Sequence, residues 1–125
     1  EQSDIINILP VTAHLQIIAD KAMIEQILIN LIRNALDATR DCKVPRIELS
    51  AGINPEGKTY IQVSDNGTGI PADVQERIFI PFFTTKPAGS GIGLSISRQI
   101  MHMHKGSLTV ISEAGQGSRF LLTFP

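Results

Sequence analysis

The spacing of hydrophobic residues changes several times along the chain, and each spacing predicts a type of element. Between Lys21 and Thr39, apolar residues recur at intervals of three and four positions, which places them on one face of a helix. Asp20 lies where an N-cap belongs, because its carboxylate can accept hydrogen bonds from free amides of the first turn. Pro45 cannot continue a helix. We therefore predict a helix over Lys21–Thr39.

Other segments alternate between apolar and polar residues, which is the period of a strand with one buried face. The alternation predicts two hairpins with turns at 54–57 and 113–117, formed by Arg46–Ile53 with Thr59–Ser64 and by Ser107–Ser112 with Ser118–Phe124. Apolar clusters at Asp4–Pro10 and Leu15–Ala19 predict two more short strands, with a turn near residues 12–14. We expect the first of these to lie at a sheet edge.

Two further segments are typical of helices. Ala72–Phe79 follows Pro71, a residue suited to a first helical position, and Gly91–His104 carries a second apolar face that Gly106 is expected to end. The order of elements predicts an α+β two-layer sandwich, with a mixed, mainly antiparallel sheet and about three helices on one face. At 125 residues, we expect a single domain over 1–125.

The composition narrows the class of protein. A hydrophobic content of 42% with 18% charged residues is typical of a soluble globular chain, and no apolar run approaches the ~20 residues that cross a bilayer. The net charge of -1 gives no electrostatic reason to expect nucleic acid as a partner. The lone Cys42 cannot form an intrachain disulfide.

Two asparagines lie on the border of the first predicted helix. Asn30 and Asn34 are four positions apart, so their carboxamides stack one turn apart where core meets surface. Amide oxygens are suited to Mg2+, and the pair could face one cluster of metal and phosphate. Taken alone, two solvated surface residues are the simpler interpretation.

Two glycine-rich segments follow. Asp65, Gly67 and Gly69 come directly after a predicted strand, where a carboxylate can accept a hydrogen bond from an exocyclic amine such as that of adenine, although an ordinary turn has the same pattern. Gly89, Gly91 and Gly93 open the last predicted helix, an arrangement that favours phosphate. It matches neither the P-loop nor the Rossmann pattern.

The segment between these clusters, from Phe79 to Lys86, combines aromatic anchors with a lysine in a loop rich in proline and glycine. Such a loop predicts a hinged lid over a polyphosphate, whereas the plainer alternative is a loop attached to the core by its phenylalanines. For Phe79 and Phe82 we expect core packing.

These motifs resemble, in their order, the N, G1, F and G2 boxes of the catalytic ATP-binding domain of sensor histidine kinases. That domain belongs to the superfamily, with the Bergerat fold, of type II topoisomerase and mismatch-repair ATPases. The resemblance covers nearly the whole chain, from Ile17 to Pro125. The sequence Thr84-Thr85-Lys86 is similar to that of a subgroup of the family with short lids.

The resemblance implies a role for each matching residue. Asn34 would bind Mg2+ with Asn30 beside the phosphates, and Asp65 would accept the adenine amine in a pocket shaped by Gly67, Gly69 and Ile70. Ser118, in place of the commoner threonine, would help to hold adenine. The lid and the phosphate cradle would be formed by Thr84, Thr85, Lys86, Gly89, Ser90, Gly91, Ile92, Gly93 and Leu94.

The residue type at Asn30 bears on whether the domain would transfer the phosphoryl group of ATP or hydrolyse ATP. In the relatives that hydrolyse ATP, the residue four positions before the metal asparagine resembles a glutamate acting as general base, and an amide cannot take that proton. Transfer to a histidine needs no strong base, because catalysis is mostly positioning and charge neutralisation, with Asn30 and Lys86 assisting.

The acceptor histidine of the family is followed by an acidic residue, and His14, His102 and His104 are not. We therefore expect this chain to be a part of a longer sensor kinase. We expect the part to be monomeric and cytoplasmic, and the parent protein could carry a membrane anchor. Its partners would be a dimerisation and phosphoacceptor domain, reached through an apolar patch near Phe82 and Phe83, and a response regulator. The alternatives are a serine protein kinase of the anti-sigma-factor type and a nucleotide-sensing module without transfer.

Overall fold

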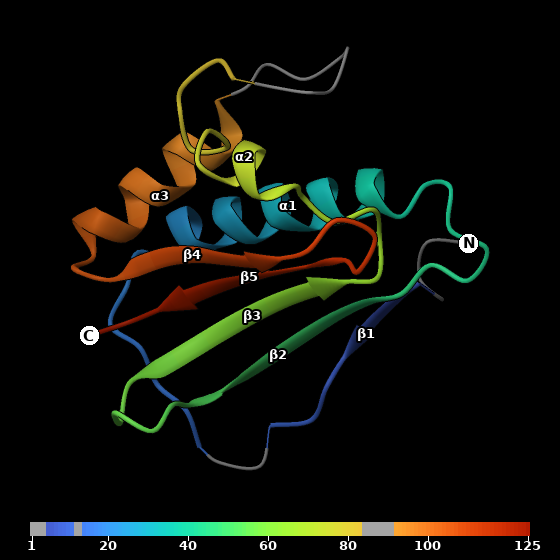
Figure 1. Ribbon diagram of the computed structural model, residues 1–125. Helices are drawn as coiled ribbons and strands as arrows, with labels where there is room; N and C mark the ends of the chain where they lie inside the picture. The colour runs from blue at the N-terminus through green and yellow to red at the C-terminus, as the bar shows by residue number, and fades with distance from the viewer. Residues whose placement is uncertain (1–4, 12–13, 84–91) are drawn as a thin grey trace.

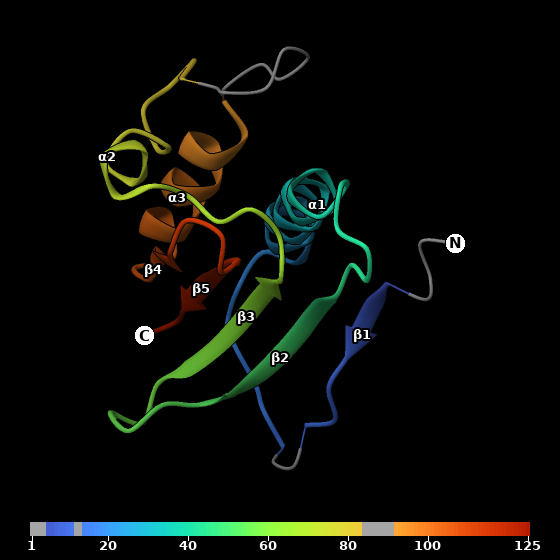
Figure 2. The same ribbon diagram turned by 45° about the vertical axis from the view of Figure 1, so that its right-hand side comes forward.

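The computed structural model describes residues 5–11, 14–83 and 92–125. Its elements follow one another as β1 (Ile6–Ile8), α1 (Lys21–Ala38), β2 (Ile47–Ile53), β3 (Thr59–Asp65), α2 (Ala72–Gln75), α3 (Gly93–Met103), β4 (Ser107–Ser112) and β5 (Ser118–Thr123). The strands form one sheet in the order β1-β2-β3-β5-β4. The helices cover one face of this sheet, as Figures 1 and 2 show. The predicted two-layer α+β architecture is confirmed.

Helix α1 forms the centre of the helical layer. Asp20 is its N-cap, and the carboxylate accepts the amide hydrogen of Met23 at 3.0 Å, as predicted. One face of the helix packs on the sheet through fully or nearly fully buried side chains, which are Ile24, Ile27, Leu31 and Ala35. The core of the domain therefore lies between α1 and the inner face of the sheet, where Ile47, Val63, Leu108 and Leu122 are buried.

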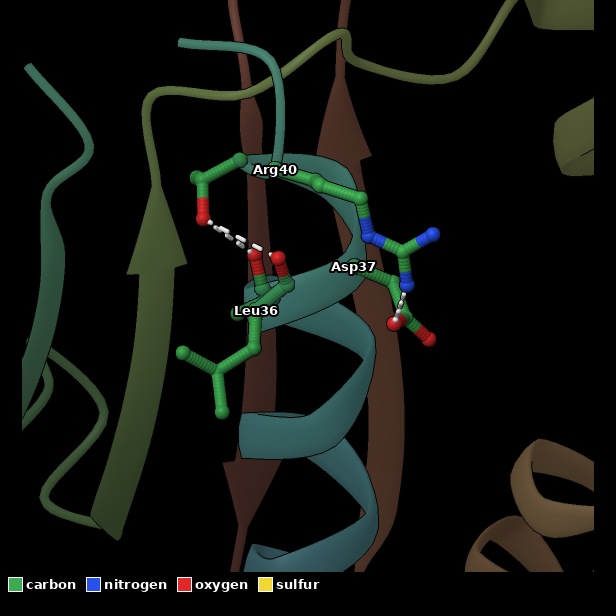
Figure 3. A network of polar contacts seen from close by, with 5 residues as sticks. Leu36, Asp37 and Arg40 are labelled. Carbon is green, nitrogen blue, oxygen red and sulfur yellow. Dashed lines mark hydrogen bonds and ion pairs between the residues drawn. The ribbon is translucent and has the colours of Figure 1, made fainter. Parts of the chain in front are cut away.

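The end of α1 is closed by its C-cap residue, Thr39. The buried Thr39 hydroxyl donates to the carbonyl of Ala35 at 2.9 Å, and its contact with the Leu36 carbonyl is longer, at 3.3 Å (Figure 3). On the outer side, Arg40 and Asp37 form an exposed ion pair of 2.8 Å. The buried hydroxyl thus finds its own partner in the last turn of the helix, where the Ala35 carbonyl also accepts the Thr39 amide hydrogen.

Both predicted hairpins are confirmed, but the predicted strand at Leu15–Ala19 is wrong. Residues 15–19 form no helix or strand, and Ile18 is fully exposed. Strand β1 instead pairs with β2 in parallel, at the edge of the sheet. Parallel neighbours need a long crossover, which α1 supplies, so the intervening segment leads into the helix and does not return as a strand. The turn predicted near residues 12–14 falls largely outside the described residues.

Two helices are shorter than predicted. Helix α2 stops at Gln75, and the chain continues in turns in which Arg77 and Ile80 donate to carbonyls three residues back. Helix α3 begins at Gly93 with Ile92 as its N-cap; the predicted start at Gly91 lies outside the described residues. In the described part of the chain, no helix has the length and apolarity needed to cross a membrane.

Helix α3 ends at Met103, shortly before Gly106, and the left-handed residue that follows it is Lys105. Lys105 has φ of 61°, and its amide and that of Gly106 close the helix on His102 and Met101. Gly106 is needed for a different reason, because a Cβ there would come against the Thr123 carbonyl oxygen and within 2.9 Å of Met101 Cε.

The His104 ring joins the end of α3 to the start of α1. Its Nε2 accepts the Asp20 amide hydrogen at 3.0 Å, and its Nδ1 lies 2.8 Å from the Ile100 carbonyl oxygen. Because Nε2 accepts, Nδ1 is the ring atom that donates to the Ile100 carbonyl. The bond from Asp20 to His104 fixes α1 and α3 against each other in an antiparallel arrangement.

We predict that Lys105→Gly stabilises the domain. Glycine adopts positive φ without the steric cost that a side chain incurs, about 1 kcal/mol, so the midpoint of urea unfolding should rise. Gly106→Ala should lower the midpoint, because its Cβ has no space. An unchanged or lower midpoint for Lys105→Gly would contradict the left-handed assignment.

Candidate functional site

Of the two asparagines of α1, Asn30 lies where α3 begins. Asn30 and Asn34 are both half-buried. The Asn30 side chain lies within 3.4 Å of the hydroxyl of Ser97, a buried residue of α3. A Cβ on Gly93 would come within 2.9 Å of Asn30 Nδ2, and closer still to its Oδ1. The absence of a side chain at Gly93 therefore lets the start of α3 approach the Asn30 amide.

This end of α3 is suited to an anion. The N-cap residue, Ile92, has no polar side chain to offer the first amides, while Leu94 packs against the hydrophobic core. The N-cap side chain makes no hydrogen bond to the first turn, and the positive end of the helix dipole lies beside Asn30. Such a helix start favours an anion.

The segment after β3 runs between the end of α1 and the β4–β5 hairpin (Figure 1). Thr68 donates its amide hydrogen to the Ala38 carbonyl at 3.2 Å, and the Gly115 amide donates to the Thr68 carbonyl at 2.6 Å. A Cβ at Gly67 would collide with the Ala38 backbone, and one at Gly69, where φ is 71°, would collide with the Glu113 carbonyl. Glycine is required at both positions by close approach.

Asp65 ends β3 at the mouth of this segment. Its carboxylate accepts the Gly67 amide hydrogen at 2.8 Å. Burial raises the pKa of this carboxyl above its ordinary value of 3.8, and hydrogen bonds from the Gly67 and Ser118 amides offset part of that shift. The side chain is thus a partly desolvated acceptor, which an amine of a ligand would stabilise in its charged form.

Ser118 stands directly opposite Asp65, because the two residues are register partners between β3 and β5. The Ser118 hydroxyl is 2.8 Å from that of Ser112, at the end of β4, and Ser118 is 5% exposed. The Ser112 hydroxyl also accepts the Ile70 amide hydrogen at 2.8 Å. The structure therefore brings Asp65, Ile70 and Ser118, three of the predicted site residues, close together.

Some residues of this region were not found by sequence reasoning. Ser112 and Gln75 hold Ile70 in place, and Ser97 contacts Asn30. Asn66 fixes the loop before β2, accepting from the Arg46 amide and donating to the Val44 carbonyl, both at 2.8 Å. Their partners are distant in sequence, so no local pattern indicates their roles.

The other predicted lid and phosphate residues, Thr84, Thr85, Lys86, Gly89, Ser90 and Gly91, lie outside the described residues. Phe79 packs against the core as expected, with the Arg98 guanidinium 4.5 Å from its ring centroid. The packing expected of Phe82 is wrong, because that side chain is 76% exposed on a backbone with φ of 70°.

The residues fit a metal that is bound together with a nucleotide. Within residues 5–11, 14–83 and 92–125, no group of three or more His, Cys, Asp or Glu side chains could hold an ion. Asn34 offers one neutral oxygen, so a cation there would take its remaining ligands from phosphates and water. Mg2+ is commonly bound in this way.

The fold and the arrangement of these residues define a nucleotide-binding class with the Bergerat architecture. Residues 19–125 match the family described as histidine kinase-, DNA gyrase B- and HSP90-like ATPases, and the chain belongs to that family. Within it, the chain is a histidine kinase catalytic domain, homologous to sensor kinases.

Two sensor proteins illustrate the relationship. The chain is 38% identical over 109 residues to the sensor protein FixL of Bradyrhizobium diazoefficiens, covering 87% of the chain and 22% of FixL. It is 37% identical over 107 residues to the histidine-protein kinase AtoS of Escherichia coli, covering 86% of the chain and 17% of AtoS. The chain thus spans about a fifth of the length of these relatives.

Solved structures of histidine kinases have the same fold. The catalytic domain of histidine kinase ThkA superposes with a TM-score of 0.81 at 33% identity, covering 99% of this chain and 81% of that one. Full-length ShkA in complex with AMPPNP gives a TM-score of 0.83 at 32% identity, covering 99% of this chain and 26% of that one.

The pKa of Asp65 leads to a prediction about pH. Because the folded state raises this pKa, it binds the proton more tightly than the unfolded chain, and the contribution of Asp65 to stability is lost as pH rises from the ordinary pKa of 3.8 through the raised pKa. Asp65→Asn removes this loss. Its stability relative to wild type should therefore increase between pH 4 and pH 7 in thermal unfolding without ligand. A relative stability that decreases over that range would contradict the assignment.

Proposed function

We propose that this chain binds ATP with Mg2+ and transfers the γ-phosphoryl group to a histidine on a dimerisation and phosphoacceptor domain of the same protein. The observation that carries the proposal is that Asp65 and Ser118 lie opposite each other at one end of the site, while Asn30 lies against Gly93 at the other. The first pair supplies an acceptor for an amine, and the second lies at a helix start that favours an anion.

Each residue then has a chemical role. The Asp65 carboxylate accepts the adenine amine, and Gly67, Gly69 and Ile70 shape the base pocket. Asn34 holds Mg2+, which when bound neutralises charge on the phosphates, and Asn30 lies beside them. The remaining roles follow the family motifs: Gly89, Ser90, Gly91, Ile92, Gly93 and Leu94 cradle phosphate, and Thr84, Thr85 and Lys86 belong to the lid.

The carboxamide at Asn30 favours transfer over hydrolysis. Its nitrogen lies 3.4 Å from the Ser97 hydroxyl, and an amide cannot remove a proton from water. A histidine acceptor needs no such base, since neutral imidazole is already nucleophilic.

The rest of the system belongs to the same proposal. The chain would act as one domain over 1–125 of a longer cytoplasmic or membrane-anchored kinase, monomeric by itself. Ile80 and Phe82 are 51% and 76% exposed, which supports an apolar contact with the acceptor domain near this turn. A response regulator would then receive the phosphoryl group.

The metal role of Asn34 can be measured by calorimetric titration of ATP and GTP, each with and without Mg2+. Wild type should bind ATP more tightly with Mg2+ and bind GTP weakly. Asn34→Ala should lose about tenfold or more of the Mg2+-dependent affinity, the usual cost of losing a metal contact. Gln26→Ala, on the exposed side of α1, is the matched control. An unchanged Mg2+ dependence in Asn34→Ala would contradict the ligand assignment.

Transfer itself is tested by incubating the chain and labelled ATP with the phosphoacceptor domain of the parent protein. We expect acid-labile phosphate on that domain, and none when its acceptor histidine is replaced by glutamine. Acid-stable phosphate on serine would instead favour the anti-sigma-factor type of kinase. ATP binding without any transfer would favour a nucleotide-sensing module.

A further inference from the structure

Ser112 lies outside the predicted motifs in the sequence, but its hydroxyl contacts residues of the proposed adenine site. Its hydroxyl oxygen has three polar neighbours: the Ile70 amide nitrogen at 2.8 Å, the Gly117 carbonyl oxygen at 3.0 Å and the Ser118 hydroxyl oxygen at 2.8 Å. These neighbours differ in what they can do. An amide nitrogen only donates, a carbonyl only accepts, and a hydroxyl does either.

The hydroxyl protons can be assigned from this difference. Ser112 has one proton, and donating it to Gly117 satisfies the carbonyl. The short contact between the two serine oxygens then needs the proton of Ser118, so Ser118 donates to Ser112. This arrangement satisfies all three contacts. If Ser112 donated to Ser118 instead, its bond to the Gly117 carbonyl would be lost.

Ser112 is itself held firmly. Gln75, from α2, donates its side-chain amide hydrogens to the Ile70 carbonyl at 2.7 Å and to the Ser112 carbonyl at 2.8 Å. Ile70 is thus bonded on both sides, through its amide to Ser112 and through its carbonyl to Gln75. The position of the Ser112 hydroxyl is therefore set by a closed ring of hydrogen bonds.

We propose that Ser112 is a positioning residue that holds the Ser118 hydroxyl as a hydrogen-bond acceptor, so that Ser118 and Asp65 together select a purine with an amino group at position 6. The inference rests on the proposed binding of ATP. Asp65 and Ser118 are register partners, so the two acceptors face one edge of the base. A purine with an oxygen at position 6 would place that hydrogen-bond acceptor against two others, the Asp65 carboxylate and the Ser118 hydroxyl oxygen. Such a contact between acceptors is unfavourable.

The test compares the affinities of ATP and inosine triphosphate by calorimetry, because the two nucleotides differ at position 6. Wild type should prefer ATP. Ser112→Ala should lower the ratio of the two affinities about 3- to 10-fold, the usual effect of one hydrogen bond, because Ser118 becomes free to donate. Ser112→Thr, which keeps the hydroxyl, should retain the preference. Ser107→Ala, at the other end of β4, is the matched control.

A double-mutant cycle shows whether Ser112 acts through Ser118. In a Ser118→Ala background, Ser112→Ala should no longer change the ratio. If Ser112→Ala weakens both nucleotides equally, or acts equally in both backgrounds, its role is structural and the proposal fails. If Ser112→Ala does not fold, Ser118→Ala alone tests the proposal. An unchanged ratio of the affinities for ATP and inosine triphosphate in Ser118→Ala overturns it.

These outcomes are separate from those that test the proposed function. A wild-type chain that binds neither nucleotide would contradict ATP binding, and this inference with it. A wild-type chain that binds ATP with Mg2+ but keeps its preference in Ser112→Ala would contradict only the role of Ser112.

Discussion

The close approach of three backbone segments at the end of β3 is the constraint on which the site depends. The chain at Gly67 lies against the end of α1, and at Gly69 it lies against the β4–β5 hairpin, with no space for a Cβ at either position. Gly117, with φ of 84°, likewise lies against the Asp65 carbonyl. The glycines that shape the proposed base pocket therefore also hold the helical layer, the central strand and the hairpin together.

A second feature of the site is a cost in stability. Asp65 is a carboxyl whose pKa is raised by burial, so its charge is destabilising in the folded chain without a ligand. A ligand amine would remove much of this penalty on binding. Sites that hold a desolvated charge in this way are often functional, and here the carboxylate lies in the segment that we propose to hold the base.

The sequence predicted the regular parts of the fold well, because each depends on a local pattern. The face of α1, its Asp20 cap and the two hairpins follow from hydrophobic spacing and turn residues. The failures depended on partners far along the chain. Residues 15–19 have strand-forming side chains, but the edge beside β2 is taken by β1. Phe82 is exposed although aromatic residues usually pack, and no local signal indicated its positive φ.

By itself, then, the sequence determined the architecture, the family and the residue types of the site, because periodicity and motif order are properties of neighbours in the chain. Only the tertiary structure decided which atoms meet. The contact of Asn30 with Gly93 and Ser97 requires α1 and α3 to pack together. The bonds of Ser112 to Ile70 and Ser118 require β4 to lie beside β5 and the glycine segment. Such contacts depend on packing and register, which a single sequence does not encode at any one position.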